Sequence, residues 1–260
     1  MNHRYPFTLH GDKPEQRTLT GLAQVAWLVI LLAAVLAGAG CGVLGPSITG
    51  SGNTVAKEYD LVGFSRLAVG NAFQVAIAHG PKHSVTVTVD DNLVEHLDVA
   101  KSGDILRIKL RPNLNVRNAT LRATVALPEL TGLDLSGAVR ATLTGFNSDK
   151  SLDAELSGAC NLRGDIKNGD ARFDVSGASK IELRGSARAL KASASGASTV
   201  NLAEYKSGNT VADASGASHI TVIPSGNLQA DASGASSVKY GGEPTDVKAH
   251  TSGASSVRKK

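Results

Sequence analysis

The hexapeptide Asp213-Ala214-Ser215-Gly216-Ala217-Ser218 returns unchanged at residues 231–236 of this chain. Its central Ser-Gly-Ala occurs seven times from residue 136 onward, and successive copies are 18 to 21 residues apart. The first serines of the seven motifs are Ser136, Ser157, Ser176, Ser195, Ser215, Ser233 and Ser252. A period of about 20 residues over seven copies is typical of a repeat protein whose units stack on their neighbours.

Apolar and polar residues alternate on both sides of each motif. One and three residues before the serine, nearly every repeat carries Leu, Val, Phe or Ala. Five and seven residues after it, apolar residues prevail again, as in Ile181 and Leu183. This period of two predicts two strands per repeat, each with one buried face. The position between the two apolar residues before the serine is polar in every copy: Asp134, Glu155, Asp174, Ser193, Asp213, Asp231 and His250.

Each repeat therefore consists of a strand, a Ser-Gly-Ala corner, a second strand and a polar turn. One such unit cannot bury its apolar face alone, but units stacked about 4.8 Å apart can. The predicted fold class is all-β, a parallel β-helix or β-solenoid. The motif glycine would serve a bend with positive φ or a close approach of two backbones. If the alternation of inward- and outward-facing residues continued through the motif, the chain would have no corner there and the glycine would be buried.

Residues 1–41 have the layout of an export signal. A polar segment precedes an apolar run at 21–40, and small residues then lead to Cys41. This end is similar to the lipobox of bacterial lipoproteins, in which Cys41 becomes the lipidated N-terminus, although Gly38 stands where Leu is usual. An uncleaved membrane anchor is one alternative, because about 20 apolar residues can span a bilayer. Cleaved secretion is the other, and all three place the repeats outside the cytoplasm. The favoured lipoprotein places them in the cell envelope, anchored to a membrane.

The remaining chain divides into three parts. Residues 42–58 are rich in Gly, Ser, Pro and Thr, which predicts a flexible linker. Residues 59–130 lack the motif but alternate at 65–69, 72–78, 84–89, 105–110 and 120–127, with a short helical turn expected within 92–99. We predict that 59–130 form irregular β coils that cap one end of the repeat solenoid of residues 131–260. A cap is needed because an open end would expose strand edges.

Several short segments from Asp60 onward have a characteristic order. They are Gly63-Phe64-Ser65-Arg66-Leu67-Ala68-Val69, Phe73-Gln74-Val75-Ala76-Ile77, Asp90-Asp91-Asn92-Leu93, Gly103-Asp104-Ile105-Leu106-Arg107-Ile108 and the run 128–138 into the first motif. In this layout, over about 200 residues, the chain resembles the putative auto-transporter adhesin, head GIN domain family. The resemblance implies a right-handed parallel β-helix on exported, often lipidated bacterial proteins. The family name implies adhesion, and no catalytic or binding residues come with it.

The acidic column is the sharpest functional candidate. Strands in register would hold carboxylates of neighbouring repeats about 5 Å apart, and a cation such as Ca²⁺ would relieve their repulsion. However, the repeats lack the Gly-Gly-x-Gly-x-Asp pattern of calcium-binding β-rolls, and Ser193 interrupts the column. The alternative is a solvated face partly paired with Lys and Arg, so we assign no metal and no cofactor. The column consists of Asp134, Glu155, Asp174, Asp213 and Asp231.

Serine, histidine and cysteine offer weaker candidates. The motif serines, and the serines three positions later from Ser179 to Ser255, would bind sugar hydroxyls or hydrogen-bond the backbone at the turns. None lies in a nucleophile motif such as Gly-x-Ser-x-Gly. Cys160 is predicted to be a small buried packing residue. No metal-ligand spacing relates His3, His10, His83, His96, His219 and His250.

Composition and repeats together favour a binding protein over an enzyme. The net charge is +4 with both signs interspersed, and no basic stripe with interleaved aromatics indicates a nucleic-acid partner. We predict a non-enzymatic, membrane-tethered envelope protein that displays a repetitive surface to a glycan or protein ligand. A polysaccharide-active β-helix enzyme is one alternative, but it would need long loops around a groove, and these repeats run almost without insertions. An envelope sensory or accessory protein with a protein partner is the other.

Overall fold

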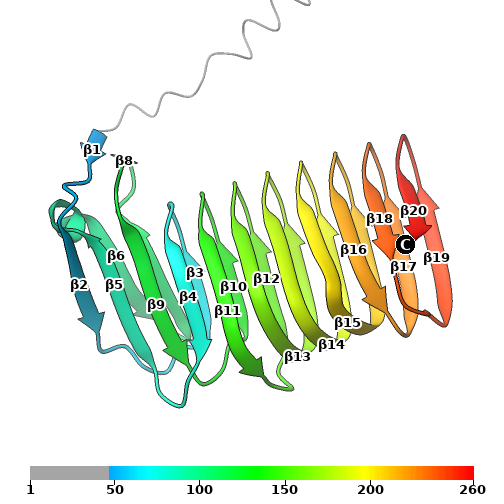
Figure 1. Cartoon of the computed structure of the whole chain (residues 1–260), viewed down its shortest axis with the longest axis horizontal. Helices are drawn as coiled ribbons and strands as arrows, with labels where there is room; N and C mark the ends of the chain where they lie inside the picture. The colour runs from blue at the N-terminus through cyan, green and yellow to red at the C-terminus, as the bar shows by residue number, and fades with distance from the viewer. Residues whose placement is uncertain (1–46) are drawn as a thin grey trace, which may run out of the picture. The chain divides into compact units, whose positions relative to one another are not determined.

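The computed structural model describes residues 47–260, which are almost entirely β-structure. Their strands stack in a row as a β-solenoid, as the sequence predicts (Figure 1). The predicted signal or anchor segment, including Cys41, lies outside the described residues. None of the helical structure within 47–260 is long and apolar enough to cross a membrane.

Each repeat places one strand before and one strand after the Ser-Gly-Ala corner. The first repeat has β10 (Gly132–Leu135) before its corner and β11 (Arg140–Asn147) after it, and the next begins with β12 (Leu152–Leu156). In the middle of the solenoid, the second strand of one repeat runs without a break into the first strand of the next. These long strands are β13 (Asn161–Val175), β14 (Lys180–Ala194) and β15 (Thr199–Ala214). The remaining strands are β16 (His219–Pro224), β17 (Asn227–Ala232), β18 (Ser237–Tyr240), β19 (Asp246–Thr251) and β20 (Ser256–Lys259).

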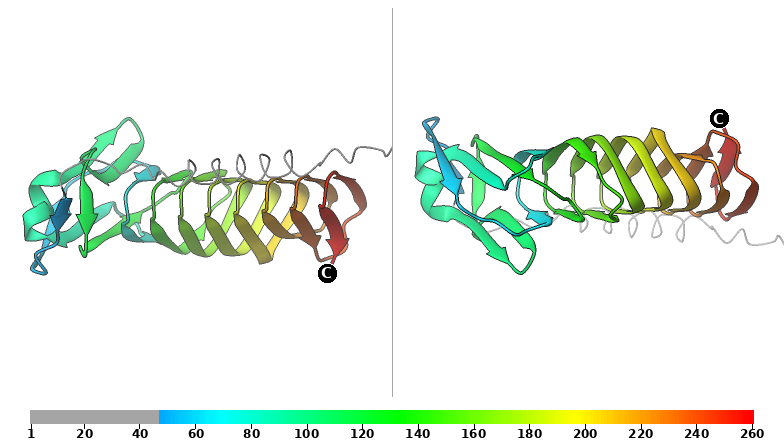
Figure 2. Two further views of the ribbon diagram at one scale, coloured as in Figure 1. Left: turned by 90° about the horizontal axis from the view of Figure 1, so that it is seen from above. Right: turned by 90° about the horizontal axis from the view of Figure 1, so that it is seen from below.

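Neighbouring repeats pair in parallel, in a register that superimposes their motifs. Asp134 pairs with Glu155, and Glu155 with Asp174, one residue per coil along the axis. The hydrogen-bond ladder continues around the corner, because from the second motif onward the alanine N–H donates to the glycine carbonyl of the previous motif. This distance is 2.7 Å from Ala178 to Gly158 and 2.8 Å from Ala197 to Gly177. The coils follow one another along a single axis (Figure 2).

The core consists of the predicted inward columns. Leu135, Phe173 and Ala192 represent the apolar positions before the serine, and none exposes more than 2% of its surface. The positions after the serine are buried in the same way, as at Ile181 and Leu202. Alternation with a period of two is therefore sufficient to separate the inside of this solenoid from the outside.

The corner glycine serves both purposes that the sequence left open. Its φ is positive in all seven motifs, between 71° and 83°, which non-glycine residues rarely adopt. A Cβ added to Gly196 would also lie 2.6 Å from the carbonyl oxygen of Gly177 in the previous coil. The third reading, a buried glycine without a corner, is wrong, because all seven motif glycines lie exposed at a turn.

Residues 59–130 lie at one end of the stack and combine parallel coils with antiparallel strands. β3 (Arg66–Val69) and β4 (Gln74–His79) pair with β10 and β11, and β7 (Ile105–Leu110) and β9 (Leu121–Leu127) pair with β3 and β4. Beyond them, β5 (Ser84–Asp90) and β6 (Leu97–Ser102) add in antiparallel fashion to β9 and β7. The expected helical turn is the 3₁₀ helix η1 (Asp91–His96). The antiparallel strands interrupt the parallel stacking at this end.

The prediction of a flexible linker at residues 42–58 is wrong for residues 47–58, the part that the structure describes. β1 (Ser47–Thr49) pairs with β8 (Asn115–Arg117), and β2 (Thr54–Tyr59) pairs antiparallel with residues 85–90 of β5. Composition predicted a linker because Gly and Ser dominate around residue 50. The prediction missed that β5 offers an open edge to the β-forming residues of β2. Residues 42–46 lie outside the described region.

Candidate functional site

A groove runs across the coils on the outer face of the strands that precede the corner. It has a volume of about 570 Å³ and extends from β10 to β19. The groove combines two columns that the sequence singled out, the polar column and the motif serines. The polar column lines it with Asp134, Glu155, Asp174, Ser193, Asp213, Asp231 and His250, and the serines are Ser157, Ser176, Ser195, Ser215, Ser233 and Ser252.

The acidic column is only partly neutralised by neighbouring cations. Arg172 donates from Nε to Asp174 at 2.8 Å, and this contact raises the pKa of the guanidinium. Burial raises the pKa of Asp213, as do the charges of Asp231 and Asp174, against the opposing effect of Lys191. The carboxylates therefore act on one another across the coils, and the groove presents negative charge on both sides of Ser193.

The same residues do not form a metal centre of their own. Within residues 47–260, no group of three or more His, Cys, Asp and Glu side chains is arranged to hold a metal ion. Pairing in register places Ser193 between Asp174 and Asp213, which separates the acidic column into two parts. The arrangement is a ladder of single charges, one per coil, which suits an extended ligand more than one ion.

The two serine columns differ in their surroundings. The motif serines lie at the groove, whereas Ser179, Ser198, Ser218 and Ser236 are buried with at most 2% of their surface exposed. Their hydroxyls bond to the backbone: Ser198 Oγ donates to the carbonyl of Ser195 at 2.6 Å, and Ser218 Oγ to that of Ala194 at 3.0 Å. The backbone interpretation is thus confirmed for the buried column. The motif serines from Ser157 to Ser252, by contrast, line the groove.

Cys160 occupies the buried serine column, as a small packing residue. It is 1% exposed, and its Sγ lies 3.2 Å from the carbonyl oxygen of Ser157. Burial raises the pKa of the thiol, which disfavours the reactive thiolate. The prediction of a structural cysteine is confirmed.

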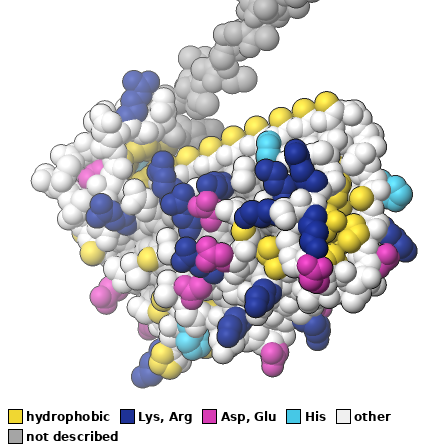
Figure 3. Space-filling model, turned by 45° about the vertical axis from the view of Figure 1, so that its right-hand side comes forward, with side chains coloured by type: hydrophobic (Ala, Val, Ile, Leu, Met, Phe, Trp, Pro, Cys, Tyr) yellow, Lys and Arg dark blue, Asp and Glu magenta, His cyan; other side chains and the backbone are white. Residues whose placement is uncertain are grey.

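The rim of the groove is a row of small side chains. Each motif exposes its alanine at the turn, and the space-filling view shows a straight row of hydrophobic side chains along this edge (Figure 3). The seven alanines are Ala138, Ala159, Ala178, Ala197, Ala217, Ala235 and Ala254. Their regular spacing follows from the hydrogen-bond ladder around the corner, which repeats at every coil. The rim is therefore uniform along its length.

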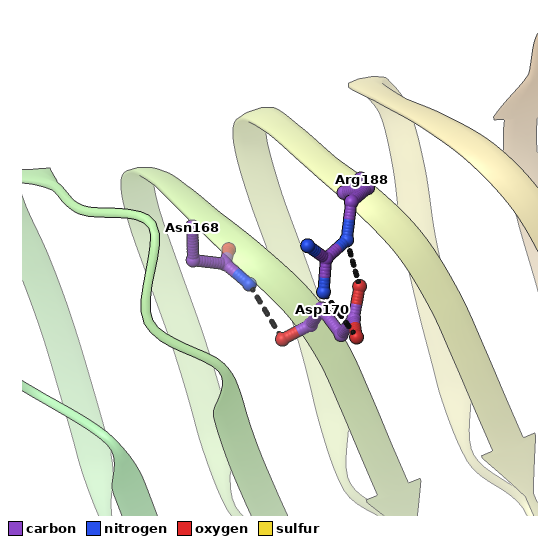
Figure 4. A network of polar contacts seen from close by, with 3 residues as sticks. All are labelled: Asn168, Asp170 and Arg188. Atoms are coloured by element: carbon purple, nitrogen blue, oxygen red, sulfur yellow. Dashed lines mark hydrogen bonds and ion pairs between the residues drawn. The ribbon is translucent and has the colours of Figure 1, made fainter.

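An ion pair joins two coils on the side of this face away from the corner. Arg188 donates from Nε and Nη2 to the two carboxylate oxygens of Asp170, at 2.9 and 2.8 Å (Figure 4). The hydrogen bonds from Arg188 lower the pKa of the Asp170 carboxyl. Asn168 donates to the carbonyl oxygen of Asp170 at 3.0 Å and accepts from the buried Tyr205 hydroxyl at 2.5 Å. The pair links β13 to β14 beside a second hollow, which Arg172 and Lys191 also line.

One pair of histidines escaped the sequence analysis. His79 precedes His83 by four residues, a spacing that occurs in metal sites. In the structure, His79 Nδ1 lies 3.1 Å from the carbonyl oxygen of Pro128, and His83 Nε2 lies 2.9 Å from that of Phe64. The two histidines lie at the turn after β4, and each ring contacts the carbonyl of a different distant residue. The pair belongs to no metal site within residues 47–260.

The comparison with family models covers most of the fold described above. Residues 63–244 match the model described as "Putative auto-transporter adhesin, head GIN domain". The chain belongs to this family. The head GIN match begins just before β3 and ends just before β19. It therefore contains the two parallel coils of the cap, β3 with β4 and β7 with β9, and most of the groove. The search of curated proteins found no match.

Solved structures of similar proteins share the fold of this head GIN domain. A putative adhesin from Bacteroides fragilis NCTC 9343 is 20% identical with a TM-score of 0.78, and the match covers 82% of this chain and 100% of that one. A putative adhesin from Parabacteroides distasonis ATCC 8503 is 16% identical with a TM-score of 0.65, over 83% of this chain and 100% of that one. A structure from the same organism described as a putative lipid binding protein is 17% identical with a TM-score of 0.63, over the same shares. At these identities the likeness establishes the fold alone.

Proposed function

We propose that this head GIN protein is a non-enzymatic protein of the cell envelope. It is held at a membrane through its N-terminus, and its solenoid displays a repetitive surface for adhesion to an extended polymer. The observation that supports this most is the groove between β10 and β19, in which one carboxylate or polar group and one hydroxyl recur at each coil. A ligand with its own repeat can make the same contact many times, so weak contacts add up along its length.

The shape of the groove favours binding over catalysis. Hydrolysis of a glycosidic bond typically uses two carboxyl groups placed on either side of that bond. Here the carboxylates form a single column along the axis. The family name and the adhesin descriptions of the neighbouring structures point in the same direction.

The membrane tether is testable at Cys41. We expect intact mass measurement of the native protein to give a mature species that begins at Cys41 and carries added acyl mass. The Cys41→Ser variant should lose both the acyl mass and the membrane fraction. If residues 1–40 are retained and the variant fractionates as the native protein does, the anchor is an uncleaved helix and the lipid proposal is wrong.

Binding in the groove is testable with matched polymers. A linear glucosamine polymer is cationic at mildly acidic pH, where its amines are protonated and exposed carboxylates of the protein remain ionised, and its N-acetylated form is neutral, so the pair separates charge from shape. We expect the full-length protein to prefer the cationic polymer at that pH and at low salt. The triple variant Asp174→Asn, Asp213→Asn, Asp231→Asn should bind it about tenfold more weakly, because three half-exposed carboxylates each contribute modestly. Surface plasmon resonance on immobilised polymer would measure this.

The matched control changes three carboxylates outside the groove. Asp60, Asp104 and Asp149 are exposed and do not line the groove, so their replacement by Asn alters net charge equally. Equal weakening in both triple variants would mean that net charge, and not the groove, attracts the polymer. Release of reducing or unsaturated sugar from a polysaccharide would overturn the non-enzymatic proposal.

A further inference from the structure

A further polar hollow, separate from the groove and from the hollow beside Asp170, lies on the strands that follow the corner, where the cap meets the repeats. β9, β4 and β11 are adjacent there, and their register aligns Arg122 with Gln74 and Gln74 with Arg140. Two residues further along, Thr124, Ala76 and Thr142 are aligned in the same way. Because paired residues point to the same side of a sheet, two arginines and two threonines flank a central glutamine and alanine.

The small side chain of Ala76 leaves room between its larger neighbours. The hollow has a volume of about 440 Å³, and the residues that face outward around it are exposed. Val75 and Ala123 reach its floor and are 3% exposed, so the base of the hollow is rigid β-sheet. We name this site the Arg122–Arg140 pocket, and it comprises Gln74, Ala76, Arg122, Thr124, Arg140 and Thr142.

The positive charge of the pocket is not compensated within residues 47–260. Arg122 and Arg140 form no ion pair there, and the side chains of Gln74, Thr124 and Thr142 form no hydrogen bond with other described residues. Some arginines of the solenoid bind carboxylates, as in the 2.8 Å contact between Arg163 and Glu182. The Arg122–Arg140 pocket instead holds two arginines that lack such a contact among the described residues and that lie in one row, on either side of Gln74.

The adjoining strands do not supply the missing acid. β5 lies beside β9, and its residues paired with Arg122 and Thr124 are Thr88 and Thr86. β13 lies beside β11, and its residues paired with Arg140 and Thr142 are Asn161 and Arg163. The nearest carboxylates in these rows lie one strand further out on each side. Glu58 of β2 pairs with Thr86, and Glu182 of β14, which pairs with Arg163, is bound by Arg163 and by Lys180.

We propose that the Arg122–Arg140 pocket binds the carboxylate of an acidic glycan. A guanidinium matches a carboxylate with two parallel hydrogen bonds, and a pair of arginines on either side of Gln74 can hold one carboxylate between them. The Gln74 amide and the two threonine hydroxyls are suitable partners for sugar hydroxyls. None of the residues that line the pocket is aromatic, so it lacks the stacking platform that a nucleic-acid base requires. This site goes beyond the proposed function, because it lies outside the groove and has the opposite charge.

The test uses the full-length protein and oligogalacturonate, a carboxylate-bearing oligosaccharide, in isothermal titration calorimetry at low salt. We expect Arg122→Gln and Arg140→Gln each to weaken binding about tenfold, and the double variant about a hundredfold, since each charged hydrogen-bonding partner is worth about one decade. Raised salt should weaken binding of the native protein as well. All the substituted side chains are exposed, so the variants are expected to keep the native circular dichroism spectrum.

Two controls separate the pocket from general charge and from the groove. Arg107 and Arg258 are exposed arginines outside the pocket, and their joint replacement by Gln should leave binding unchanged. The groove triple variant should also bind oligogalacturonate as the native protein does, which keeps the two proposals distinct. Unchanged binding in the Arg122→Gln, Arg140→Gln double variant would overturn the proposal. So would binding of inorganic phosphate or of a neutral oligosaccharide as tight as that of oligogalacturonate.

Discussion

Gly196→Ala is expected to lower the free energy of unfolding by about 3 kcal/mol or more, although it adds one exposed methyl group. The φ of Gly196 is +71°, a left-handed conformation that costs a Cβ-bearing residue about 1–2 kcal/mol. The new Cβ would also lie 2.6 Å from the carbonyl oxygen of Gly177, so the corner of one coil must move away from the next. That movement would stretch the 2.8 Å hydrogen bond from Ala197 to Gly177. Urea denaturation followed by circular dichroism would measure the loss.

Gly103→Ala is the matched control for this prediction. Gly103 has a φ of +61°, and no heavy atom lies within 4 Å of the position that its Cβ would take. The control therefore has the backbone strain without the close approach, and it should cost about 1 kcal/mol. Equal losses in the two variants would mean that the stacked carbonyl of Gly177 gives way easily, and that the close approach of the corners is unimportant.

Asn71 is the one residue with a side chain in this column of corners, and its position explains why. It turns the chain between β3 and β4 with a φ of +61°, and the carbonyl of Asn71 accepts from Ala138 in the next coil. On its other side lies the coil of β7 and β9, which has no Ser-Gly-Ala corner. The side chain of Asn71 uses that space, since its Oδ1 accepts from the N–H of Leu110 at 2.8 Å. A residue with a side chain is therefore tolerated at Asn71, because the stack of Ser-Gly-Ala corners ends beside it.

The repeats were predictable in detail because every column is sampled several times. Alternation around the serines gave the inward faces, and the constant period implied that the acidic residues from Asp134 to Asp231 would align. The groove that these residues share with the motif serines was harder to predict, because it depends on the direction in which the chain turns at each corner. The spacing of His79 and His83 was overlooked, although it could be read directly from the sequence.

The cap was less predictable because its order in space differs from its order along the chain. The strands at 65–69 and 72–78 could be recognised by alternation, yet they stack directly beneath the first repeat, and the later β7 and β9 lie beyond them. Such pairing depends on long-range complementarity that a single copy of each strand does not reveal. The Arg122–Arg140 pocket combines two of these cap strands, β4 and β9, with β11 of the first repeat, so no local motif predicts it.

Phe173→Ala is expected to lower the free energy of unfolding by about 3–5 kcal/mol, the range for removal of a fully buried aromatic ring. Phe173 has no exposed surface, and its partners in register on the two adjoining coils are Ala154 and Ala192. Its ring meets that of Tyr205 edge to face, with centroids 6.0 Å apart. These small neighbours mean that one aromatic side chain fills space that three coils share. Thermal and urea denaturation of the variant would measure the loss.

The size of this loss depends on whether the solenoid can close over the cavity. Backbone hydrogen bonds fix the spacing of neighbouring strands at about 4.8 Å, so the coils that carry Ala154 and Ala192 cannot approach each other to fill the space. Phe173→Leu keeps most of the volume and should cost only about 1–2 kcal/mol, which provides the graded control. If Phe173→Ala instead cost no more than the Leu variant, the two faces of the solenoid would have to move together across the core. A thin, repetitive core would then be more compliant than its continuous hydrogen-bond ladder implies.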